Sequence, residues 1–201
     1  MSDPEIYSVP GCKLTFNTPN KTGCTSIKQA LARGIGVPPL LIGNPHDSSR
    51  FHYLKGVDEV PEDHTVVLSV RQVMGRLASC WRNKVQGKPL PAMYEQGFRG
   101  DMTFEDFCHL CCDIPDEEAD QHFRSQTYYH SRYDHLLRCE HLAGDWEKIA
   151  PVLKKQGLLY YPVQKLNSSS GAVPSLPTPA QKKVGKRYEK DFDFTRKVYE
   201  Q

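Results

Sequence analysis

The stretch Lys13-Leu14-Thr15-Phe16-Asn17-Thr18, followed shortly by Lys21-Thr22-Gly23-Cys24-Thr25-Ser26, decides the fold of this chain. The first segment alternates apolar and polar residues, which predicts a half-buried strand. After the second segment, Ile27, Ala30 and Leu31 recur at the spacing of a helix. A strand, a turn of small and hydroxyl residues and a helix direct backbone N–H groups at one place, a geometry that binds phosphate or sulfate. The lysine that opens the turn adds a positive charge.

Length and charge set the first limits on function. The 201 residues suffice for one hydrophobic core but not for two comfortable domains, so we expect a single domain over residues 1–201. The 26 Lys and Arg residues nearly balance the 24 Asp and Glu residues, which argues against nucleic acid or a membrane surface as a partner. No apolar run has the length of a membrane span, and residues 1–5 do not resemble a signal peptide. We therefore expect a cytoplasmic protein, with its oligomeric state open.

The seven cysteines are odd in number and scattered, which argues against a disulfide framework. Residues 108–112 (Cys-His-Leu-Cys-Cys) look like half of a metal site, but no second half completes four ligands. Phe104, Phe107, Cys108 and Cys111 instead follow the i, i+3, i+4, i+7 spacing of a buried helix face. We interpret these cysteines as core residues and expect no metal.

A second strand-then-helix unit follows the first. Residues 65–70 are apolar and β-branched, which predicts a buried strand, and apolar residues over 74–85 recur at helical spacing. Residues 51–54 fit a short strand between the two units. Two strand-then-helix units in succession predict an α/β fold with a parallel sheet.

The rest of the chain reads mainly as helices. Thr103, with Asp106 three residues later, predicts a capped helix, and Asp145 suits the cap of another. Residues 133–139 fit a strand between these helices. Ser, Pro and Gly residues predict a flexible loop over 167–187 that ends in a basic cluster, and an amphipathic helix closes the chain.

The turn differs from the nucleotide-binding P-loop pattern, because its lysine precedes the glycine and no strand ends in a magnesium-binding Asp. The second strand ends instead in Arg71, and Arg76 and Ser79 in the following helix are free of its apolar face. Arginine binds phosphate bidentately and serine adds a donor. One anion at the turn and one at Arg71 and Ser79 imply a ligand with two separated anionic groups, held without metal.

With these motifs the chain resembles the sulfotransferases, most closely the Golgi-type carbohydrate enzymes that modify chondroitin and dermatan. Residues 19–26 resemble the family's P-K-x-G/A-x-T-S turn. Arg71 and Ser79 match its strand-end arginine and the serine eight residues later, and residues 76–84 resemble its R-L-x-S-x-x-R-N-K segment.

Weaker similarities continue in family order along the chain. They are residues 104–107 (F-x-x-F), 122–126 (H-W-x-x-Q), 140–146 (E-x-L-x-x-D) and 188–192 (Y-x-x-D-F). The chain departs from the pattern in the extra Asn20, in Gln72-Val73 where an acidic residue and proline are usual, and in lacking the Golgi enzymes' membrane anchor.

The resemblance implies a three-layer, P-loop-like fold with a central parallel sheet flanked by helices. It implies the donor 3′-phosphoadenosine 5′-phosphosulfate, with no metal. Lys21 would face the leaving phosphate oxygen, and Thr22, Gly23, Cys24, Thr25 and Ser26 would hold the 5′-phosphate. Thr25 and Ser26 could equally cap the helix. Arg71 and Ser79 would bind the 3′-phosphate.

Similar enzymes place a general base between the first helix and the Arg71 strand, where His46, Asp47, His52 and His64 lie. His52 is our first choice for the base and His46 our second.

Further residues have two readings each. His122, Arg124 and Gln126 would line the acceptor site or stabilise a helix end. Lys186 and Arg187 would close over the 3′-phosphate or form a solvated charge run. Tyr188, Asp191 and Phe192 should pack the last helix.

Two other classes of function stay open. One is a magnesium-dependent P-loop kinase or NTPase, and the other is a non-catalytic glycan-binding module on the same fold. The acceptor is expected to be a carbohydrate, but a small alcohol, an amine or a peptide tyrosine is equally compatible with the residues.

Overall fold

The computed structural model describes residues 6–44, 48–130, 132–164 and 171–200. Contacts along the chain divide it into two compact units. The first unit comprises Met1–Val70 with Tyr129–Ser168, and the second comprises Arg71–Tyr128 with Ser169–Gln201. Each unit has its own hydrophobic core and is described by itself.

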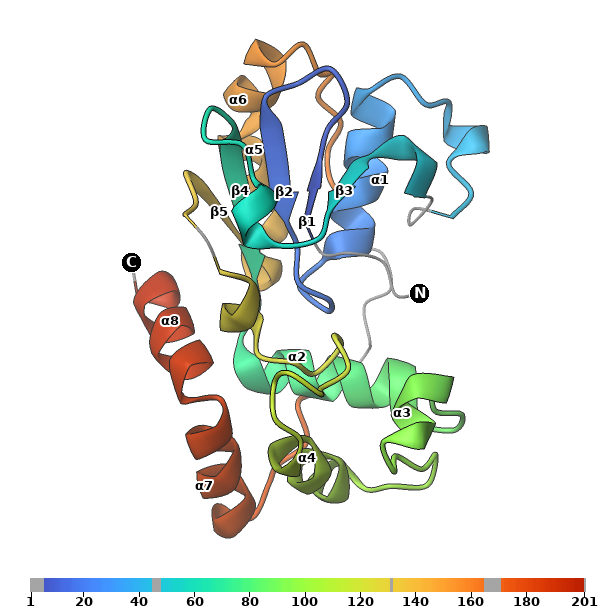
Figure 1. Ribbon diagram of the computed structural model, residues 1–201, viewed down its shortest axis with the longest axis vertical. Coiled ribbons are helices and arrows are strands. Elements are labelled where there is room, and N and C mark those ends of the chain that lie inside the picture. The colour runs from blue at the N-terminus through green and yellow to red at the C-terminus, as the bar shows by residue number, and fades with distance from the viewer. Residues whose placement is uncertain (1–5, 45–47, 131, 165–170, 201) are drawn as a thin grey trace. The chain divides into compact units, whose positions relative to one another are not determined.

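A five-stranded mixed sheet forms the centre of the first unit (Figure 1). Its strands are β1 (Ile6–Ser8), β2 (Leu14–Asn17), β3 (His52–Leu54), β4 (Thr65–Val70) and β5 (His135–Arg138). The order is β3-β1-β2-β4-β5, in which β2, β4 and β5 are parallel and β1 is antiparallel to both neighbours.

The four predicted strands are therefore confirmed, and the predicted parallel pairing is confirmed for β2, β4 and β5, whereas the sheet as a whole is mixed. The missing element is β1, whose three residues are too few to give a periodic pattern. It pairs with β2 across the short connection of residues 9–13, and antiparallel pairing is what so short a connection allows.

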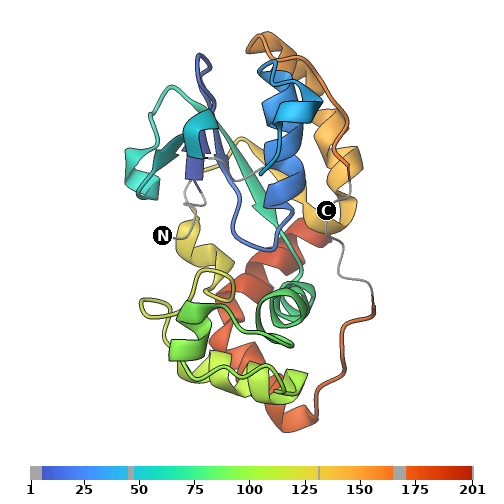
Figure 2. The same ribbon diagram turned by 90° about the vertical axis from the view of Figure 1, so that its right-hand side faces the viewer.

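Three helices of this unit lie on one side of the strands, as Figure 2 shows in blue and orange. They are α1 (Cys24–Gly34), α5 (Leu142–Lys148) and α6 (Ala150–Lys155). Ile27, Ala30 and Leu31 of α1 are buried against Phe16 of β2 and Trp146 of α5, which confirms the predicted helix face. The unit also contains the short 3₁₀ helices η1 (Pro39–Leu41), η2 (Ser48–Arg50), η3 (Val57–Glu59) and η6 (Cys139–His141).

Asp145 does not cap a helix, contrary to the prediction. Helix α5 begins at Leu142, so Asp145 lies in its first turn, and its carboxylate binds Arg138 at the end of β5. The Arg138 Nε and Nη2 atoms lie 2.9 and 2.8 Å from the two carboxylate oxygens. The cap position belongs to His141, and the Asp145 carboxylate pairs bidentately with the arginine instead.

The second unit is helical. Its elements are α2 (Val73–Cys80), the π-helical turn η4 (Trp81–Val85), α3 (Pro91–Glu95), α4 (Phe104–Asp113), α7 (Thr178–Arg187) and α8 (Glu189–Tyr199). The 3₁₀ helix η5 (Gln126–Tyr129) ends where the chain returns to the first unit. Residues 178–187 are thus helix rather than the flexible loop we expected, because Ala180 and Val184 pack into the core. Residues 165–170 lie outside the described part of the chain.

Helix α4 matches its prediction in detail. Thr103 and Asp106 form a reciprocal capping box, with the Asp106 N–H donating to Thr103 Oγ1 over 3.1 Å. Cys108 and Cys111 are fully buried beside Phe107, so both are core residues as predicted. Burial raises the pKa of both thiols, which keeps them protonated and unreactive. Within the described residues, no group of three or more His, Cys, Asp and Glu side chains is placed to hold a metal ion.

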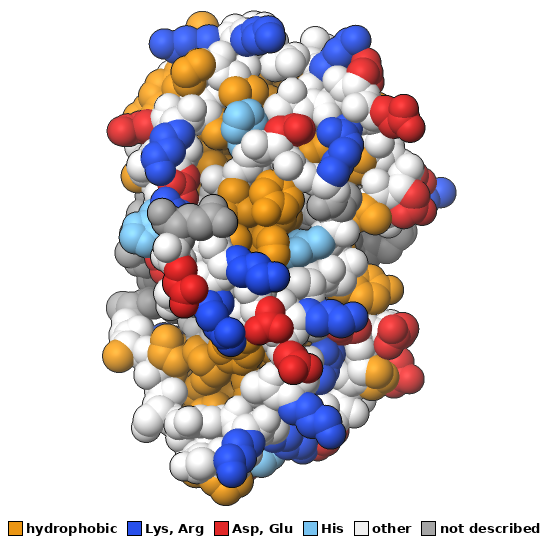
Figure 3. All heavy atoms as spheres, turned by 90° about the vertical axis from the view of Figure 1, so that its left-hand side faces the viewer, with side chains coloured by type: hydrophobic (Ala, Val, Ile, Leu, Met, Phe, Trp, Pro, Cys, Tyr) orange, Lys and Arg blue, Asp and Glu red, His pale blue; other side chains and the backbone are white. Residues whose placement is uncertain are grey.

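The surface agrees with the balanced composition. On the face drawn in Figure 3, basic and acidic side chains are interspersed rather than gathered by sign. None of the helices in the described part of the chain combines the length and the hydrophobicity that crossing a bilayer requires.

Candidate functional site

The turn between β2 and α1 has an unusual backbone. Lys21 has φ 71°, and it is the one non-glycine residue with positive φ among those the structure describes. Such a conformation costs a non-glycine residue about 1–2 kcal/mol. The Thr22 N–H donates to the Pro19 carbonyl over 3.1 Å and closes the turn. Strained backbone of this kind clusters at functional sites, which makes Lys21 a candidate functional residue.

Gly23 is required at its position for two reasons. Its φ is 99°, and a Cβ atom added there would lie 3.0 Å from Leu142 Cδ2 of α5. A side chain would therefore strain the backbone and collide with a packed neighbour. Gly23 is also the N-cap residue of α1, so the helix begins directly after it.

Thr22 anchors the turn to the sheet. Its Oγ1 lies 2.6 Å from the Pro19 carbonyl oxygen and 2.5 Å from Ser69 Oγ of β4. Both Thr22 and Ser69 are fully buried. The sequence analysis missed Ser69, although a serine inside the apolar strand 65–70 was a signal, because a buried hydroxyl needs a partner.

The first turn of α1 is suited to an anion. Gly23 provides no side-chain cap, and the first turn contains no acidic residue. The N–H groups at a helix start have no partner within the helix, and the helix dipole favours negative charge there. Thr25 and Ser26 lie inside this turn rather than at the cap position, so capping α1 is not their role.

Lys28 is a second lysine near this turn that the sequence analysis missed. It is 2% exposed, and its Nζ lies 5.0 Å from the ring centroids of both Tyr7 and Tyr53. Its spacing one turn after Cys24, on the buried face of α1, was the available signal. The two rings stabilise the buried ammonium by cation–π attraction.

Arg71 and Ser79 belong to the second unit. Arg71 lies between β4 and α2, and its main chain is hydrogen-bonded to the side chain of Gln126. Ser79 is 3% exposed on α2 rather than at the surface. Arg76, which the pattern left open to an anion, is buried and donates to the carbonyls of Gln121 and Arg124.

The candidate bases have different surroundings. His52 is exposed at the start of the edge strand β3, opposite Ser8 of β1. His64 is engaged, since its Nδ1 lies 2.9 Å from Thr15 Oγ1, which lies 2.9 Å from Ser8 Oγ. His46 and Asp47 lie outside the described residues.

Of the residues predicted for the acceptor site, His122 and Arg124 form contacts within their own segment. Gln126 is instead fully buried, and its side chain is bonded to the main chain of Arg71. His122 Nδ1 lies 2.7 Å from the Asp120 carboxylate, and Arg124 donates through Nε and Nη2 to the Ala119 carbonyl. Burial opposes ionisation of Asp120, but the hydrogen bonds and charge of His122 together with the charge of Arg124 outweigh it and lower the pKa of that carboxyl.

Lys186 and Arg187 lie in α7 and not in a loop, which corrects that expectation. Arg187 Nη2 lies 2.7 Å from the Asp116 carboxylate and also donates to the Ile114 carbonyl. Lys186 is exposed.

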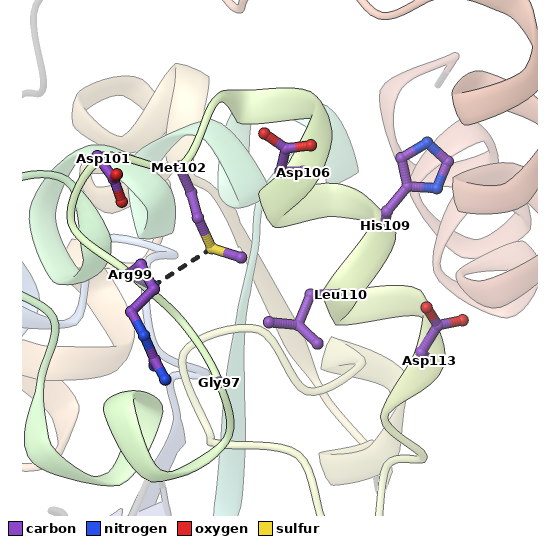
Figure 4. Close-up of a pocket in the computed structure, with 8 residues that line it drawn as sticks. All are labelled: Gly97, Arg99, Asp101, Met102, Asp106, His109, Leu110 and Asp113. Atoms are coloured by element: carbon purple, nitrogen blue, oxygen red, sulfur yellow. Dashed lines mark hydrogen bonds between the residues drawn. The ribbon is translucent and has the colours of Figure 1, made fainter.

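A pocket of about 540 Å³ opens beside α4 in the second unit (Figure 4). It is lined by Gly97, Arg99, Asp101, Met102, Asp106, His109, Leu110 and Asp113. Several of these groups already have structural roles: Asp106 caps α4, and Asp113 lies 2.6 Å from the Lys183 ammonium. None of the predicted site residues in the described ranges lines this pocket.

A mixed sheet with helices defines an α/β protein, and the lysine turn at the start of α1 is its candidate anion site. The family model described as "Sulfotransferase family" matches residues 4–195, which is nearly the whole chain and includes both units. The chain therefore belongs to the sulfotransferase family, whose members transfer sulfuryl groups. Searches of curated proteins and of solved structures returned no match.

Proposed function

We propose that this protein is a sulfotransferase that uses 3′-phosphoadenosine 5′-phosphosulfate as its donor, on a three-layer, P-loop-like fold. It transfers the sulfuryl group in line to a hydroxyl or amine of an acceptor, which we expect to be a carbohydrate. The observation that carries the proposal is the Lys21 turn. Family membership supports the reaction type, and the turn joins a lysine of positive φ to a helix start whose first N–H groups are suited to an anion.

The 5′ end of the donor would bind at this turn. The backbone from Thr22 to Ser26 and the hydroxyls of Thr25 and Ser26 would hold the 5′-phosphate, with Cys24 and Gly23 contributing main chain only. The positive φ of Lys21 and the absence of an acidic residue from the first turn of α1 support this assignment. An anion there gains from the helix dipole without a competing carboxylate.

The 3′-phosphate would bind to Arg71 and Ser79. A guanidinium can hold a phosphate through two hydrogen bonds, and a serine hydroxyl adds a third donor. Lys186, exposed on α7, stays a candidate for the same phosphate, whereas the Arg187 guanidinium is engaged with Asp116.

In the transfer step, the acceptor oxygen attacks sulfur while the bond from sulfur to the phosphate oxygen breaks. The acceptor proton passes to a base, for which His52 is our first choice and His46 our second. Lys21 stabilises the negative charge that develops on the leaving phosphate oxygen. His122 and Arg124 are proposed to contact the acceptor.

Calorimetry with 3′-phosphoadenosine 5′-phosphate tests donor binding. We expect the wild type to bind it without metal and Arg71→Ala to bind it about 10–100-fold more weakly, since a charge-assisted contact is lost. Arg99→Ala is the matched control, because Arg99 is a basic residue of the same unit whose guanidinium stacks 4.4 Å from the Tyr94 ring. Absence of binding by the wild type would overturn the proposal. Magnesium-dependent binding of ATP would favour a kinase, and glycan binding that survives Lys21→Ala without donor binding would favour a binding module.

Lys21→Ala tests catalysis. We expect kcat for sulfuryl transfer to fall by roughly 10²–10³, because removing one group that stabilises transition-state charge has an effect of this size. Lys13→Ala in the same unit is the control, since the Lys13 ammonium pairs with Asp63 at the surface, 2.7 Å away. A Lys21→Ala enzyme that keeps the wild-type kcat would show that Lys21 does not act on the leaving group.

A further inference from the structure

The main chain of Arg71 is held by a single buried side chain. Gln126 is fully buried, its Oε1 accepts the Arg71 N–H over 3.0 Å, and its Nε2 donates to the Arg71 carbonyl over 2.7 Å. The side-chain amide therefore pairs with Arg71 as a neighbouring strand would. Because both main-chain groups of Arg71 are bound, the plane of its backbone is fixed relative to Gln126.

Gln126 is in turn held by Asp191 of α8. The Gln126 N–H donates to one carboxylate oxygen over 2.9 Å, and the N–H and Oγ1 of Thr127 donate to the other over 2.9 and 2.6 Å. Asp191 is 1% exposed, and three donors compensate the cost of burying its charge. This corrects the expectation that Asp191 only packs the last helix.

The same part of the C-terminal helices binds neighbouring positions of this segment. Tyr188 Oη donates to the Phe123 carbonyl over 2.8 Å, and Arg187 Nη1 lies 3.0 Å from Ser125 Oγ. Residues within 187–191 thus form hydrogen bonds with residues 123, 125, 126 and 127. Residues 123–127, which include the Gln126 bonded to Arg71, are consequently attached to α7 and α8 by several hydrogen bonds rather than by one.

The position of Arg71 in the chain gives the hydrogen bonds from Gln126 a consequence for its side chain. Arg71 and Gln72 form the whole connection between β4 and α2, so the arginine lies outside both elements. A bidentate contact with a phosphate requires the guanidinium to be positioned to within about 0.5 Å. Such positioning depends on residues that do not touch the phosphate but fix the residue that does.

We propose that Gln126 and Asp191 are positioning residues for the 3′-phosphate of the donor, acting through the backbone of Arg71. This inference rests on the proposed function, in which Arg71 binds that phosphate. Neither residue touches the donor. Their effect is confined to the preference for a ligand that carries the 3′-phosphate over one that lacks it.

The test compares two probes, 3′-phosphoadenosine 5′-phosphate and adenosine 5′-phosphate, by calorimetry on the full chain. In the wild type we expect the first probe to bind at least about tenfold more tightly. Gln126→Met keeps the side-chain length and removes both hydrogen bonds, and Asp191→Asn removes the charge. Each should reduce the preference for the 3′-phosphate by roughly three- to tenfold, with the affinity for adenosine 5′-phosphate changed less than twofold.

A double-variant cycle separates an effect of Gln126 on the position of Arg71 from an effect on the stability of the fold. In the Arg71→Ala background, Gln126→Met should change the preference by less than twofold, because the group it positions is gone. Gln181→Met is the matched control, since Gln181 Nε2 also donates to a main-chain carbonyl, that of Leu176, over 2.7 Å. It should leave the preference at the wild-type value.

The outcomes distinguish the two proposals. If the wild type shows no preference for the 3′-phosphate, the proposed function and this inference both fail. If Arg71→Ala abolishes the preference while Gln126→Met and Asp191→Asn retain it, the proposed function stands and this inference is overturned. Should Gln126→Met not fold, the milder Asp191→Asn decides alone. Equal weakening of both probes also overturns the inference, since that is the effect of a purely structural role.

Discussion

Two features disfavour a side chain at position 23: the positive φ of the backbone and the packing against Leu142. Their effects on stability can be measured separately. Gly23 has φ 99° and lies against Leu142, whereas Gly11 has φ 72° and nothing within 4 Å of an added Cβ. Alanine at either position is strained by about 1–2 kcal/mol. Only at Gly23 does it also collide with a packed side chain, which adds about 1–3 kcal/mol.

We therefore expect Gly23→Ala to lose more unfolding free energy in urea than Gly11→Ala. We also expect Gly23→Ala alone to weaken binding of 3′-phosphoadenosine 5′-phosphate, because the turn must shift to relieve the contact with Leu142. Equal losses of stability in the two variants, with donor binding unchanged in both, would show that the turn accommodates a side chain.

At the scale of single elements, the junction of β5 and α5 depends on one carboxylate. Asp145 receives the Arg138 N–H, two Arg138 guanidinium bonds and a bond from Lys148 Nζ, 3.1 Å away. Burial of the carboxyl opposes its ionisation, but the bonds from Arg138 and Lys148 outweigh burial and hold the pKa of Asp145 well below its usual range. The ionised form is thus favoured by the folded state.

This lowered pKa gives the pH dependence a definite sign. The stabilisation from Asp145 is fully present above the unfolded-state pKa of about 3.9 and is lost as the pH falls towards the lower folded-state pKa. At pH 7 we expect Asp145→Asn to lower the free energy of unfolding by about 1.5–3 kcal/mol. The difference from wild type should shrink in urea titrations at pH 4 and pH 3. Asp193→Asn, which removes a carboxylate that is 55% exposed, controls for the loss of one negative charge. A difference that stays constant from pH 7 to pH 3 contradicts the assignment.

The elements that the sequence predicted well are those whose formation depends on residues near one another in the chain. Helix α4 follows from a capping box and an apolar stripe within eleven residues, and both are present in the structure. Strand β4 follows from a run of six residues of which all but Ser69 are apolar or β-branched. Helix α7 was missed because Lys182, Lys183, Lys186 and Arg187 dominate its composition, while only Ala180 and Val184 are buried within it.

At the scale of the whole molecule, the described residues form two hydrophobic cores with no buried residue in common. The chain has two tryptophans, and each reports on a different core. Trp146 is buried in the core of the first unit, and Trp81 packs against that of the second, 5.6 Å from the Phe104 ring.

Fluorescence of single-tryptophan variants can therefore follow each unit. Phe107→Ala removes a fully buried ring of the second unit and should lower the stability reported by Trp81 by about 3–5 kcal/mol. We expect a smaller change in the transition reported by Trp146. Leu31→Ala, in the core of the first unit, is the matched variant and should show the reverse. Identical shifts at both tryptophans would mean that the two units unfold as one.

The sequence alone determined the α/β class, four of the five strands and the lysine turn, because each depends on residues close together in the chain. It also determined the family resemblance, because that rests on short motifs and their order along the chain. The tertiary structure decided the antiparallel β1, the Thr22–Ser69 bond that fixes the turn, and the Asp191–Gln126–Arg71 chain of hydrogen bonds. These join residues up to 65 positions apart. A hydrogen bond between such residues depends on how the folded chain brings them together, and no periodicity or local motif records that.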